Sequence, residues 1–371
     1  MKISIFIPSF ETGGVENNVI LYSKIFVENS IETELVYVRA VEKKLSKVDE
    51  KVKKIKIGKK INIPFIHPRV LDSLSLIWDY YRYLKNNEVL IFSFQNSVVA
   101  IILAKLTRRK IIIRVANHPN SAKIEKSFTV KLSNFLKKVI YKYANLIITN
   151  SEVTAQALKQ ITKNNNVKTI YNPSYSLDLI SKSKEDIVDE KFNNIIGSKI
   201  IAVGRLVIQK DFITLLKAFK IVKEKINDAN LIIIGEGSER LKIEKLIKEL
   251  NLYDVYLLGF QDNPHKYVSK SDLFVLSSLY EGLPNALIEA IGVGTPAVST
   301  NCLSGPSEIL LDGRGGDLVE VGNYKALAKC IIKNLEDRDY AISKWKIAYD
   351  NLDRFSYDNI KNKLLEIIKN V

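Results

Sequence analysis

Two glutamates, Glu281 and Glu289, are the side chains of this sequence best suited to chemistry on an oxygen-rich ligand. Gly282 and Pro284 indicate a turn between them, and Pro284 suits the first position of a helix, where a missing N–H costs nothing. We therefore expect a helix from near residue 284, with Glu281 in the loop before it and Glu289 about a turn and a half inside it.

The neighbours of Glu289 favour a bound carboxylate. Leu287, Ile288, Ala290 and Ile291 surround it in sequence, and a carboxylate in apolar company is costly unless something binds it. The amides at the start of the helix suit an anion. The segment thus offers two carboxylates that can accept hydrogen bonds from sugar hydroxyls, and a helix N-terminus that can bind a phosphate. The ordinary alternative is a surface helix with two solvated glutamates.

Two cations follow another expected strand. Arg205 and Lys210 come after the buried run that ends at Gly204, and a helix opens near Asp211. Cations at a strand end can neutralise a diphosphate without a metal, although isolated basic residues are more often solvated.

Glycine-containing turns stand at other strand ends. Gly13-Gly14 lies between the first strand and a helix, where it could serve a ligand or simply form a tight turn. Gly235-Glu236-Gly237-Ser238 suits a ligand-near turn, with Ser238 as a helix N-cap. Phe260 follows Gly259 and could flank a nucleobase, although an aromatic there is more often part of the core.

One histidine stands in a comparable position. His118 follows an expected strand, where a site residue and a plain loop residue are equally plausible, whereas His67 and His265 resemble turn residues beside proline. The only Asp-x-Asp spacing, Asp337 to Asp339, fits a solvated turn at a helix end better than a metal dyad. We expect no metal and no cofactor.

Short β-rich runs alternate with helical runs in both halves, which predicts an α/β protein with parallel sheets. The expected strands are residues 2–8, 33–39, 53–57, 88–93, 110–115, 145–149, 167–171, 199–204, 230–234, 255–259, 272–276 and 296–299. The expected helices are residues 15–29, 70–86, 97–107, 124–144, 151–163, 212–227, 238–250, 284–293, 323–335 and 356–369.

The length of 371 residues favours two domains. We expect a first doubly wound domain over residues 1–172, a linker over 173–197, a second doubly wound domain over 198–340, and helices over 341–371 that pack back on the first. Two such domains facing each other would place a ligand between the carboxyl ends of their strands.

The positive charge of the chain is concentrated in its first half. Residues 1–172 hold 29 Lys and Arg against 13 Asp and Glu, a net charge of +16, whereas residues 173–371 carry −1. A basic half implies an anionic partner such as nucleic acid, an anionic membrane face or a phosphorylated acceptor, although a generally Lys-rich composition explains some of the excess. Two cysteines without metal-type spacing and a first segment that reads as a strand indicate a reducing cytoplasm.

These pieces in this order resemble the retaining GT-B glycosyltransferases of family 4, the glycosyl transferases group 1. The family's Glu-x7-Glu element is similar to Glu281 to Glu289, its Gly-Arg-x4-Lys element to Gly204 through Lys210, and its first glycine loop to Gly13-Gly14. Gly-Gly-Val-Glu, Glu-Gly-Leu-Pro-x-x-Leu-Ile-Glu-Ala and Gly-Pro-x-Glu-Ile-Leu resemble enzymes that build O-antigen, capsule or lipid-linked oligosaccharides in bacteria.

The resemblance implies a role for each candidate. Arg205 and Lys210 would bind the donor diphosphate, Glu289 the ribose hydroxyls and Glu281 the transferred sugar. His118 would contact sugar or acceptor, and Gly13 and Gly14 would leave room for phosphate. The other nucleotide-sugar-binding candidates are Gly204, Gly235, Phe260, Gly282, Leu283, Pro284, Asn285 and Ala286.

The implied reaction moves a hexosyl or N-acetylhexosaminyl group from a nucleoside diphosphate sugar, with UDP the expected nucleotide. The implied acceptor is a polyprenyl-diphosphate-linked or lipopolysaccharide or capsule glycan, met on the cytoplasmic face of the inner membrane and without nucleic acid. A GT-B-like nucleotide-sugar epimerase and a basic nucleic-acid-binding protein are the alternatives. The epimerase has no need of a basic acceptor half, and a nucleic-acid binder should show aromatics interleaved on a basic face.

Overall fold

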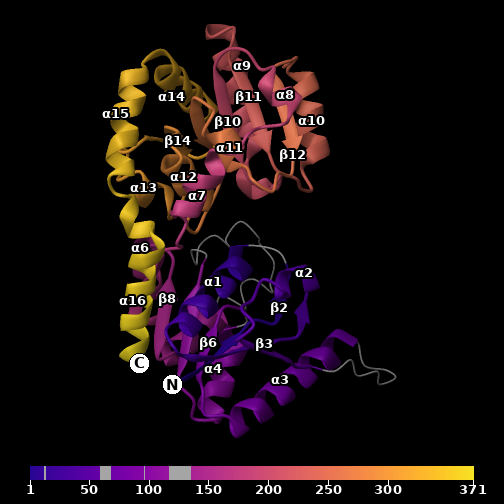
Figure 1. Ribbon diagram of the computed structural model, residues 1–371, viewed down its shortest axis with the longest axis vertical. Helices are drawn as coiled ribbons and strands as arrows, with labels where there is room; N and C mark the ends of the chain where they lie inside the picture. Colours follow the sequence, from indigo (N-terminus) through magenta and orange to yellow (C-terminus); the bar gives the residue numbers. More distant parts are fainter. Residues whose placement is uncertain (12–13, 59–67, 96, 117–134) are drawn as a thin grey trace. The chain divides into compact units, whose positions relative to one another are not determined.

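The computed structural model describes residues 1–11, 14–58, 68–95, 97–116 and 135–371, with the side chains of residues 68–75 left aside. These residues form two compact units, one of residues 1–170 with 363–371 and one of residues 171–362 (Figure 1). The first unit is therefore discontinuous in sequence.

The described part of the first unit is built on a seven-stranded parallel sheet with the order β5-β3-β1-β6-β7-β8-β9. Its strands are β1 (Lys2–Phe6), β3 (Glu32–Tyr37), β5 (Lys53–Lys56), β6 (Leu90–Ser93), β7 (Ile111–Val115), β8 (Leu146–Thr149) and β9 (Val167–Thr169), beside a short pair, β2 (Ser9–Phe10) and β4 (Arg39–Ala40). Its helical segments are α1 (Gly14–Glu28), α2 (Glu42–Leu45), α3 (Pro68–Asn86), α4 (Ser97–Leu106), η2 (Tyr141–Tyr143) and α6 (Glu152–Thr162).

The second unit has a six-stranded parallel sheet with the order β12-β11-β10-β13-β14-β15. Its strands are β10 (Lys199–Val203), β11 (Asn230–Ile234), β12 (Val255–Gly259), β13 (Leu273–Leu276), β14 (Ala297–Thr300) and β15 (Asp317–Val319). Its longer helices are α9 (Phe212–Lys225), α10 (Arg240–Glu249), α12 (Asn285–Gly292), α14 (Tyr324–Glu336) and α15 (Arg338–Tyr349). Its shorter segments are α7 (Leu177–Ser183), α8 (Glu190–Asn193), η3 (Ile208–Lys210), α11 (His265–Val268), α13 (Pro306–Ile309) and η4 (Leu352–Phe355).

Alternation along the second sheet explains its two covered faces. Ile201 and Phe274 pack in one apolar cluster with α12, while Ile200 and Leu273 pack in another with α9 and α14. Successive side chains of a strand point to opposite faces, so strands that are apolar at every position require helices on both sides. The predicted α/β class of two doubly wound units is confirmed.

The observed boundaries differ from the expected linker and C-terminal segment. Residues 173–197 belong to the second unit, where they form α7 and α8. Trp345, which we expected to pack on the first domain, instead donates from Nε1 to the Ile291 carbonyl (2.9 Å) within the second unit. The division passes inside the last helix, α16 (Tyr357–Lys369), from Lys363 onward.

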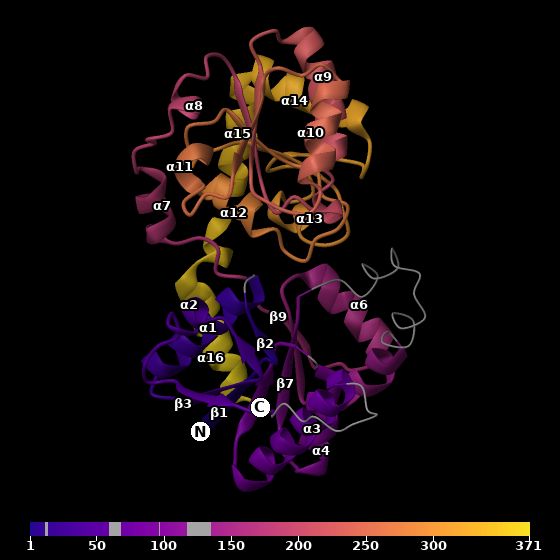
Figure 2. The same ribbon diagram turned by 90° about the vertical axis from the view of Figure 1, so that its right-hand side faces the viewer.

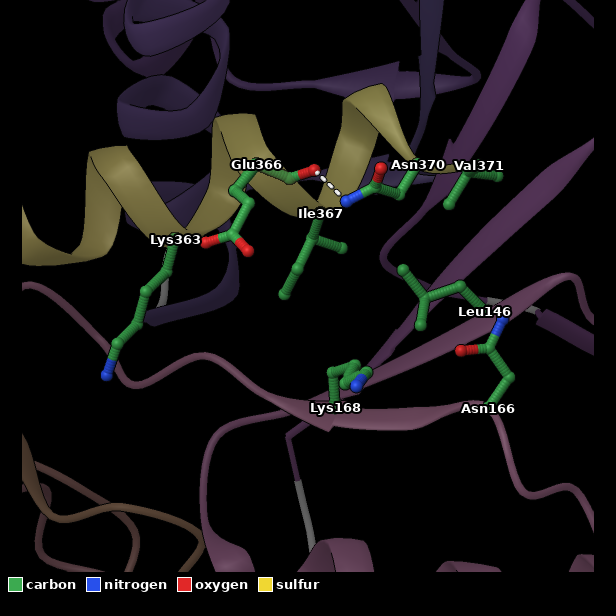
Figure 3. A pocket seen from close by; sticks show the side chains of 8 residues that line it. All are labelled: Leu146, Asn166, Lys168, Lys363, Glu366, Ile367, Asn370 and Val371. Carbon is green, nitrogen blue, oxygen red and sulfur yellow. Dashed lines mark hydrogen bonds between the residues drawn. The ribbon is translucent and has the colours of Figure 1, made fainter.

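The last residues of α16 lie over β8 and the edge strand β9 of the first unit, where they line a pocket of about 330 Å³ (Figure 3). Its lining is Leu146, Asn166, Lys168, Lys363, Glu366, Ile367, Asn370 and Val371. Leu146 begins β8 and Asn166 directly precedes β9, so the pocket lies near the amino ends of these strands. Parallel α/β sheets bind ligands at the opposite, carboxyl edge.

Candidate functional site

The candidate site lies where the strand order of the second sheet reverses. Counting strands by sequence, β10 is the first, and it lies between β11, the second, and β13, the fourth. The loops leaving β10 and β13 therefore border the crevice in which doubly wound sheets bind their ligands. These loops carry Arg205 and Lys210 on one side and Glu281 on the other.

Lys210 and Glu281 form an ion pair between these two loops. The Lys210 Nζ donates to Glu281 Oε1 at 2.6 Å, and both side chains are largely buried, with 17% and 9% of their surface exposed. Ser278 Oγ donates to the same oxygen at 2.7 Å, and Gln209 Nε2 approaches Oε2 at 3.4 Å. The carboxylate is held in one orientation by groups from both loops.

Three hydrogen bonds to main-chain carbonyl groups fix the two loops to each other. The Leu279 amide donates to the Gln209 carbonyl (2.8 Å), and Ser277 Oγ donates to the Lys210 carbonyl (2.8 Å). Gln209 Nε2 also donates to the Tyr280 carbonyl (2.9 Å). The ion pair is thus supported by backbone geometry and not by two long side chains alone.

Arg205 differs from Lys210 in its surroundings. It directly follows Gly204 after β10, is exposed, and makes no ion pair with a described residue. An exposed guanidinium beside a buried ammonium gives the loop one cation available to a ligand and one fixed in place. A planar guanidinium suits the paired oxygens of a phosphate.

The helix after Glu281 begins one residue later than expected. Pro284 is the N-cap of α12, with φ −74° and ψ 97°, and Asn285 is the first helical residue. The Leu287 amide is already used by the Pro284 carbonyl (3.0 Å), and Asn285 Oδ1 accepts from Asn172 Nδ2 (2.8 Å).

Glu289 does not point into the core. Leu287, Ile288, Ala290 and Ile291 are all buried, while Glu289 keeps 29% of its side-chain surface exposed. At 100° per residue, these apolar neighbours face the sheet from the other side of the helix and do not enclose the carboxylate.

Partial burial still perturbs this carboxyl group. Burial raises the pKa of Glu289 to about 7, against a smaller, opposing effect of the Lys210 charge. His265 Nδ1 lies 4.0 Å from Glu289 Oε2, and burial lowers the pKa of His265. Near neutral pH, Glu289 therefore stands beside a neutral imidazole, and a ligand hydroxyl could shift its protonation.

Gly204, Gly235 and Gly237 let the loops after β10 and β11 pack backbone to backbone. A Cβ on Gly235, whose φ is +144°, would lie 1.9 Å from the Gly204 carbonyl oxygen, and one on Gly237 would lie 2.3 Å from the Leu206 oxygen. These glycines position the Arg205 loop through their close packing. Ser238 is not the N-cap that we expected, because α10 has Glu239 in that place.

Ser304 and Gly305 pack against the turn formed by residues 282–284. Ser304 Oγ, which is buried, donates to the carbonyl of Glu281 (2.9 Å) and to that of Gly282 (3.1 Å). A Cβ on Gly305 would lie 2.6 Å from the Pro284 ring, so the turn and the start of α13 pack tightly. Leu283 is buried and Ala286 is half-buried.

The remaining candidates divide into exposed and undescribed positions. Phe260 is 72% exposed at the end of β12, so it is not a core residue. Gly14 begins α1, and a Cβ there would meet nothing within 4 Å. Gly13 and His118 lie outside the described residues.

Sequence reasoning missed the residues that hold the site together. Gln209 and Ser304 act through contacts between loops far apart in sequence, for which no local signal exists, whereas Ser278 donates to Glu281 within the same loop. His265 was taken for a turn residue but begins α11 beside Glu289.

Asp337, expected at a helix end, is the N-cap of α15 and accepts from the Tyr340 amide (2.9 Å).

The described residues contain no group of three or more His, Cys, Asp or Glu side chains placed to hold a metal ion. Among the same residues, no helix combines the length and the apolar character needed to cross a bilayer.

Comparison with known proteins places the chain in a family. The profile of the glycosyl transferases group 1 matches residues 184–348. The 4-alpha-N-acetylgalactosaminyltransferase of Campylobacter jejuni that acts on N-acetylgalactosamine-N,N'-diacetylbacillosaminyl-diphospho-undecaprenol is 32% identical over 66% of this chain and 64% of its own length. The amylovoran biosynthesis glycosyltransferase AmsD of Erwinia amylovora is 30% identical over 66% of this chain and 68% of its own. The alignments span 50% and 64% of the first two curated relatives.

The likeness to solved structures extends over the whole chain. HepE of Anabaena, solved in complex with UDP and glucose, superposes with a TM-score of 0.80 at 20% sequence identity, and the match covers 100% of both chains. The predicted GT-B fold is confirmed by this likeness. The chain belongs to the glycosyl transferases group 1 family.

Proposed function

We propose that this protein is a retaining glycosyltransferase that moves a hexosyl or N-acetylhexosaminyl group from a UDP-sugar to a membrane-linked glycan acceptor. The observation that carries the proposal is the Lys210–Glu281 ion pair at the switch point of the second sheet, with the exposed Arg205 on the same loop. This arrangement offers positive charge for a diphosphate and a fixed carboxylate for sugar hydroxyls.

The main task of the protein in this reaction is to stabilise the negative charge of the leaving diphosphate. As the bond to the anomeric carbon breaks, negative charge grows on the phosphate oxygen and the sugar takes on oxocarbenium character. Arg205 and Lys210 would stabilise that charge, and they would do so without a metal ion.

The fixed carboxylate has a separate role in this proposal. Glu281 would remain beside Lys210 and use its remaining acceptor capacity for a hydroxyl of the transferred sugar, while Glu289 would accept from the ribose hydroxyls. We assign no protein nucleophile. The departing phosphate oxygen would take the acceptor's proton on the face it leaves, which retains the anomeric configuration.

The acceptor follows from the relatives and the charge. The Campylobacter relative is named for a diphospho-undecaprenol substrate and AmsD for amylovoran biosynthesis. The net charge of +16 over residues 1–172 suits an anionic surface. We therefore propose a polyprenyl-diphosphate-linked or lipopolysaccharide or capsule glycan as the acceptor, met at the cytoplasmic face of the inner membrane.

The test begins with donor binding. A panel of UDP- and GDP-sugars is screened for thermal stabilisation of the protein, and the best donor is then assayed for transfer to a polyprenyl-diphosphate-linked sugar. Arg205→Ala should lower kcat/KM at least about a hundredfold, the magnitude typical of a lost charge-stabilising donor. Arg314→Ala, which alters an exposed arginine just before β15, is the matched control and should transfer normally. Normal transfer by Arg205→Ala would refute the assignment.

A further inference from the structure

The two carboxylate oxygens of Glu281 are not equally occupied. Oε1 accepts from Lys210 Nζ at 2.6 Å and from Ser278 Oγ at 2.7 Å. A carboxylate oxygen offers about two lone-pair positions, so both positions of Oε1 are filled. From the described residues, Oε2 receives only the side-chain amide of Gln209, at a long 3.4 Å. Oε2 is therefore the oxygen with capacity left for a ligand hydroxyl.

Gln209 reaches the loop that carries Glu281 through both its side chain and its main chain. One hydrogen of Nε2 is used by the Tyr280 carbonyl oxygen (2.9 Å), which leaves the second for Glu281 Oε2. The Gln209 carbonyl oxygen accepts from the Leu279 amide (2.8 Å). A single residue thus contacts three consecutive residues of the facing loop.

The turn that contains Gln209 is itself supported. Gln209 lies in η3, where the Lys210 amide donates to the Val207 carbonyl (3.0 Å). Asp211 follows this turn as the N-cap of α9, and it accepts from the Thr214 amide (3.2 Å) and hydroxyl (2.6 Å); α9 is labelled in Figure 2. A side chain whose own position is fixed in this way can hold its partner precisely.

We propose that Gln209 is a positioning residue that determines which epimer of the transferred sugar the site prefers. Its side-chain amide would fix the direction of Glu281 Oε2, and Oε2 would accept from one hydroxyl of the sugar. Two epimers differ in the direction of one hydroxyl, and a hydrogen bond weakens steeply when it is misaligned. An acceptor oxygen held in one direction therefore favours one epimer.

This inference rests on the proposed function, because it takes Glu281 as the carboxylate that meets the transferred sugar. It gives Gln209 no contact with the diphosphate, so Gln209 should affect the contribution of the sugar to binding and not that of the nucleotide. Arg205 and Lys210 lie on the same loop as Gln209. A substitution that merely distorted this loop would therefore weaken the binding of UDP as well.

The experiment measures, by titration calorimetry, the affinity of the full chain for UDP and for two series of donors. The series are UDP-glucose and UDP-N-acetylglucosamine, each with its epimers at the ring carbons C2, C3 and C4. Gln209→Met keeps the length of the side chain but removes its donor hydrogens, and Gln209→Lys restores a donor of similar reach. The control is Gln160→Met, which alters an exposed glutamine of α6 in the first unit.

In the parent, one epimer of a series should bind more tightly than the others. We expect Gln209→Met to reduce this preference at least about fivefold while its affinity for UDP stays within about twofold of the parent value. Gln209→Lys should retain most of the preference, and the control should retain all of it.

The inference is overturned if the parent shows no epimer preference, or if Gln209→Met keeps the preference of the parent. It is also overturned if Gln209→Met loses affinity for UDP and for the donors equally, or if Gln209→Lys is no better than Gln209→Met, because Gln209 would then only support the loop. A parent that does not bind UDP contradicts the proposed function, and with it this inference.

Discussion

The ammonium group of Lys210 lies 2.6 Å from the Glu281 carboxylate, across 71 positions of sequence. Each group is buried enough that the other is its main compensation for lost water, together with Ser278 and Gln209. Changes to the pair therefore affect both the fold and the chemistry, and the two effects can be separated.

Removing one partner of this pair should destabilise the second unit. Lys210→Met leaves the Glu281 charge buried without its ammonium, which typically costs about 3–5 kcal/mol, and adding Glu281→Gln should restore part of the loss. Urea unfolding followed by Trp345 fluorescence, in a Trp78→Phe background, reports the second unit alone, since the chain has two tryptophans. Strictly additive effects would show that the two groups do not interact.

Glu289 should make stability depend on pH. Its pKa of about 7 in the folded protein exceeds the ordinary 4.5, so the folded state holds more protons between these values and its stability falls as the pH rises through them. Glu289→Gln lacks this titration, so its free energy of unfolding minus that of the parent should increase as the pH rises from 5 to 8. Thermal unfolding across this range checks it, with Glu249→Gln on the exposed side of α10 as the control. A constant difference between variant and parent would contradict the shift.

Nucleotide binding should release protons through the same carboxyl group. An ionised Glu289 can accept from ribose hydroxyls, so bound UDP should lower its pKa and displace a proton near pH 6.5. Titration calorimetry in two buffers of different ionisation enthalpy measures this release. The UDP phosphate can also release protons on binding, and the Glu289→Gln variant measures that contribution alone. If the parent and the variant release the same number of protons, Glu289 does not bind the ribose.

The close packing of Gly235 gives a steric prediction. In Gly235→Ala the new Cβ would lie 1.9 Å from the Gly204 oxygen, so the loop carrying Arg205 must move and donor affinity should fall at least about tenfold. Gly322→Ala also places a side chain at positive φ (+76°), but nothing lies within 4 Å of its Cβ. Equal donor affinity in the two variants would mean that backbone strain, and not the contact with Gly204, determines the effect.

Most strands of the second sheet were predictable because apolar residues fill nearly their whole length. Asn230–Ile234 and Val255–Gly259 have the predicted bounds. Asp317–Val319 was missed, since three residues beginning with a charged one give no such signal. Asp317 is accommodated there by Lys344, which forms an ion pair with it, and by Asn334 Nδ2, which donates at 2.6 Å.

The site was predictable as a set of residues and not as a set of contacts. The turn chemistry correctly placed Glu281 before a helix and the Arg205 loop after a strand. Sequence could not reveal which oxygen of Glu281 meets Lys210, because that depends on two loops brought together by the order of β10 and β13. Glu289 lies inside the helix as predicted, but sequence neighbours alone could not give the direction of its side chain, since adjacent residues of a helix point in different directions.

The nine residues from Lys363 to Val371 belong to the unit that contains the start of the chain, and Lys110 Nζ donates to the main-chain oxygen of Val371 at 2.7 Å. During translation, this part of the first unit cannot form until residues 363–371 have been synthesised and have left the ribosome. Recombinant expression of residues 1–170 would lack it entirely, and a tag fused after Val371 would be attached directly beside β8 and the edge strand β9.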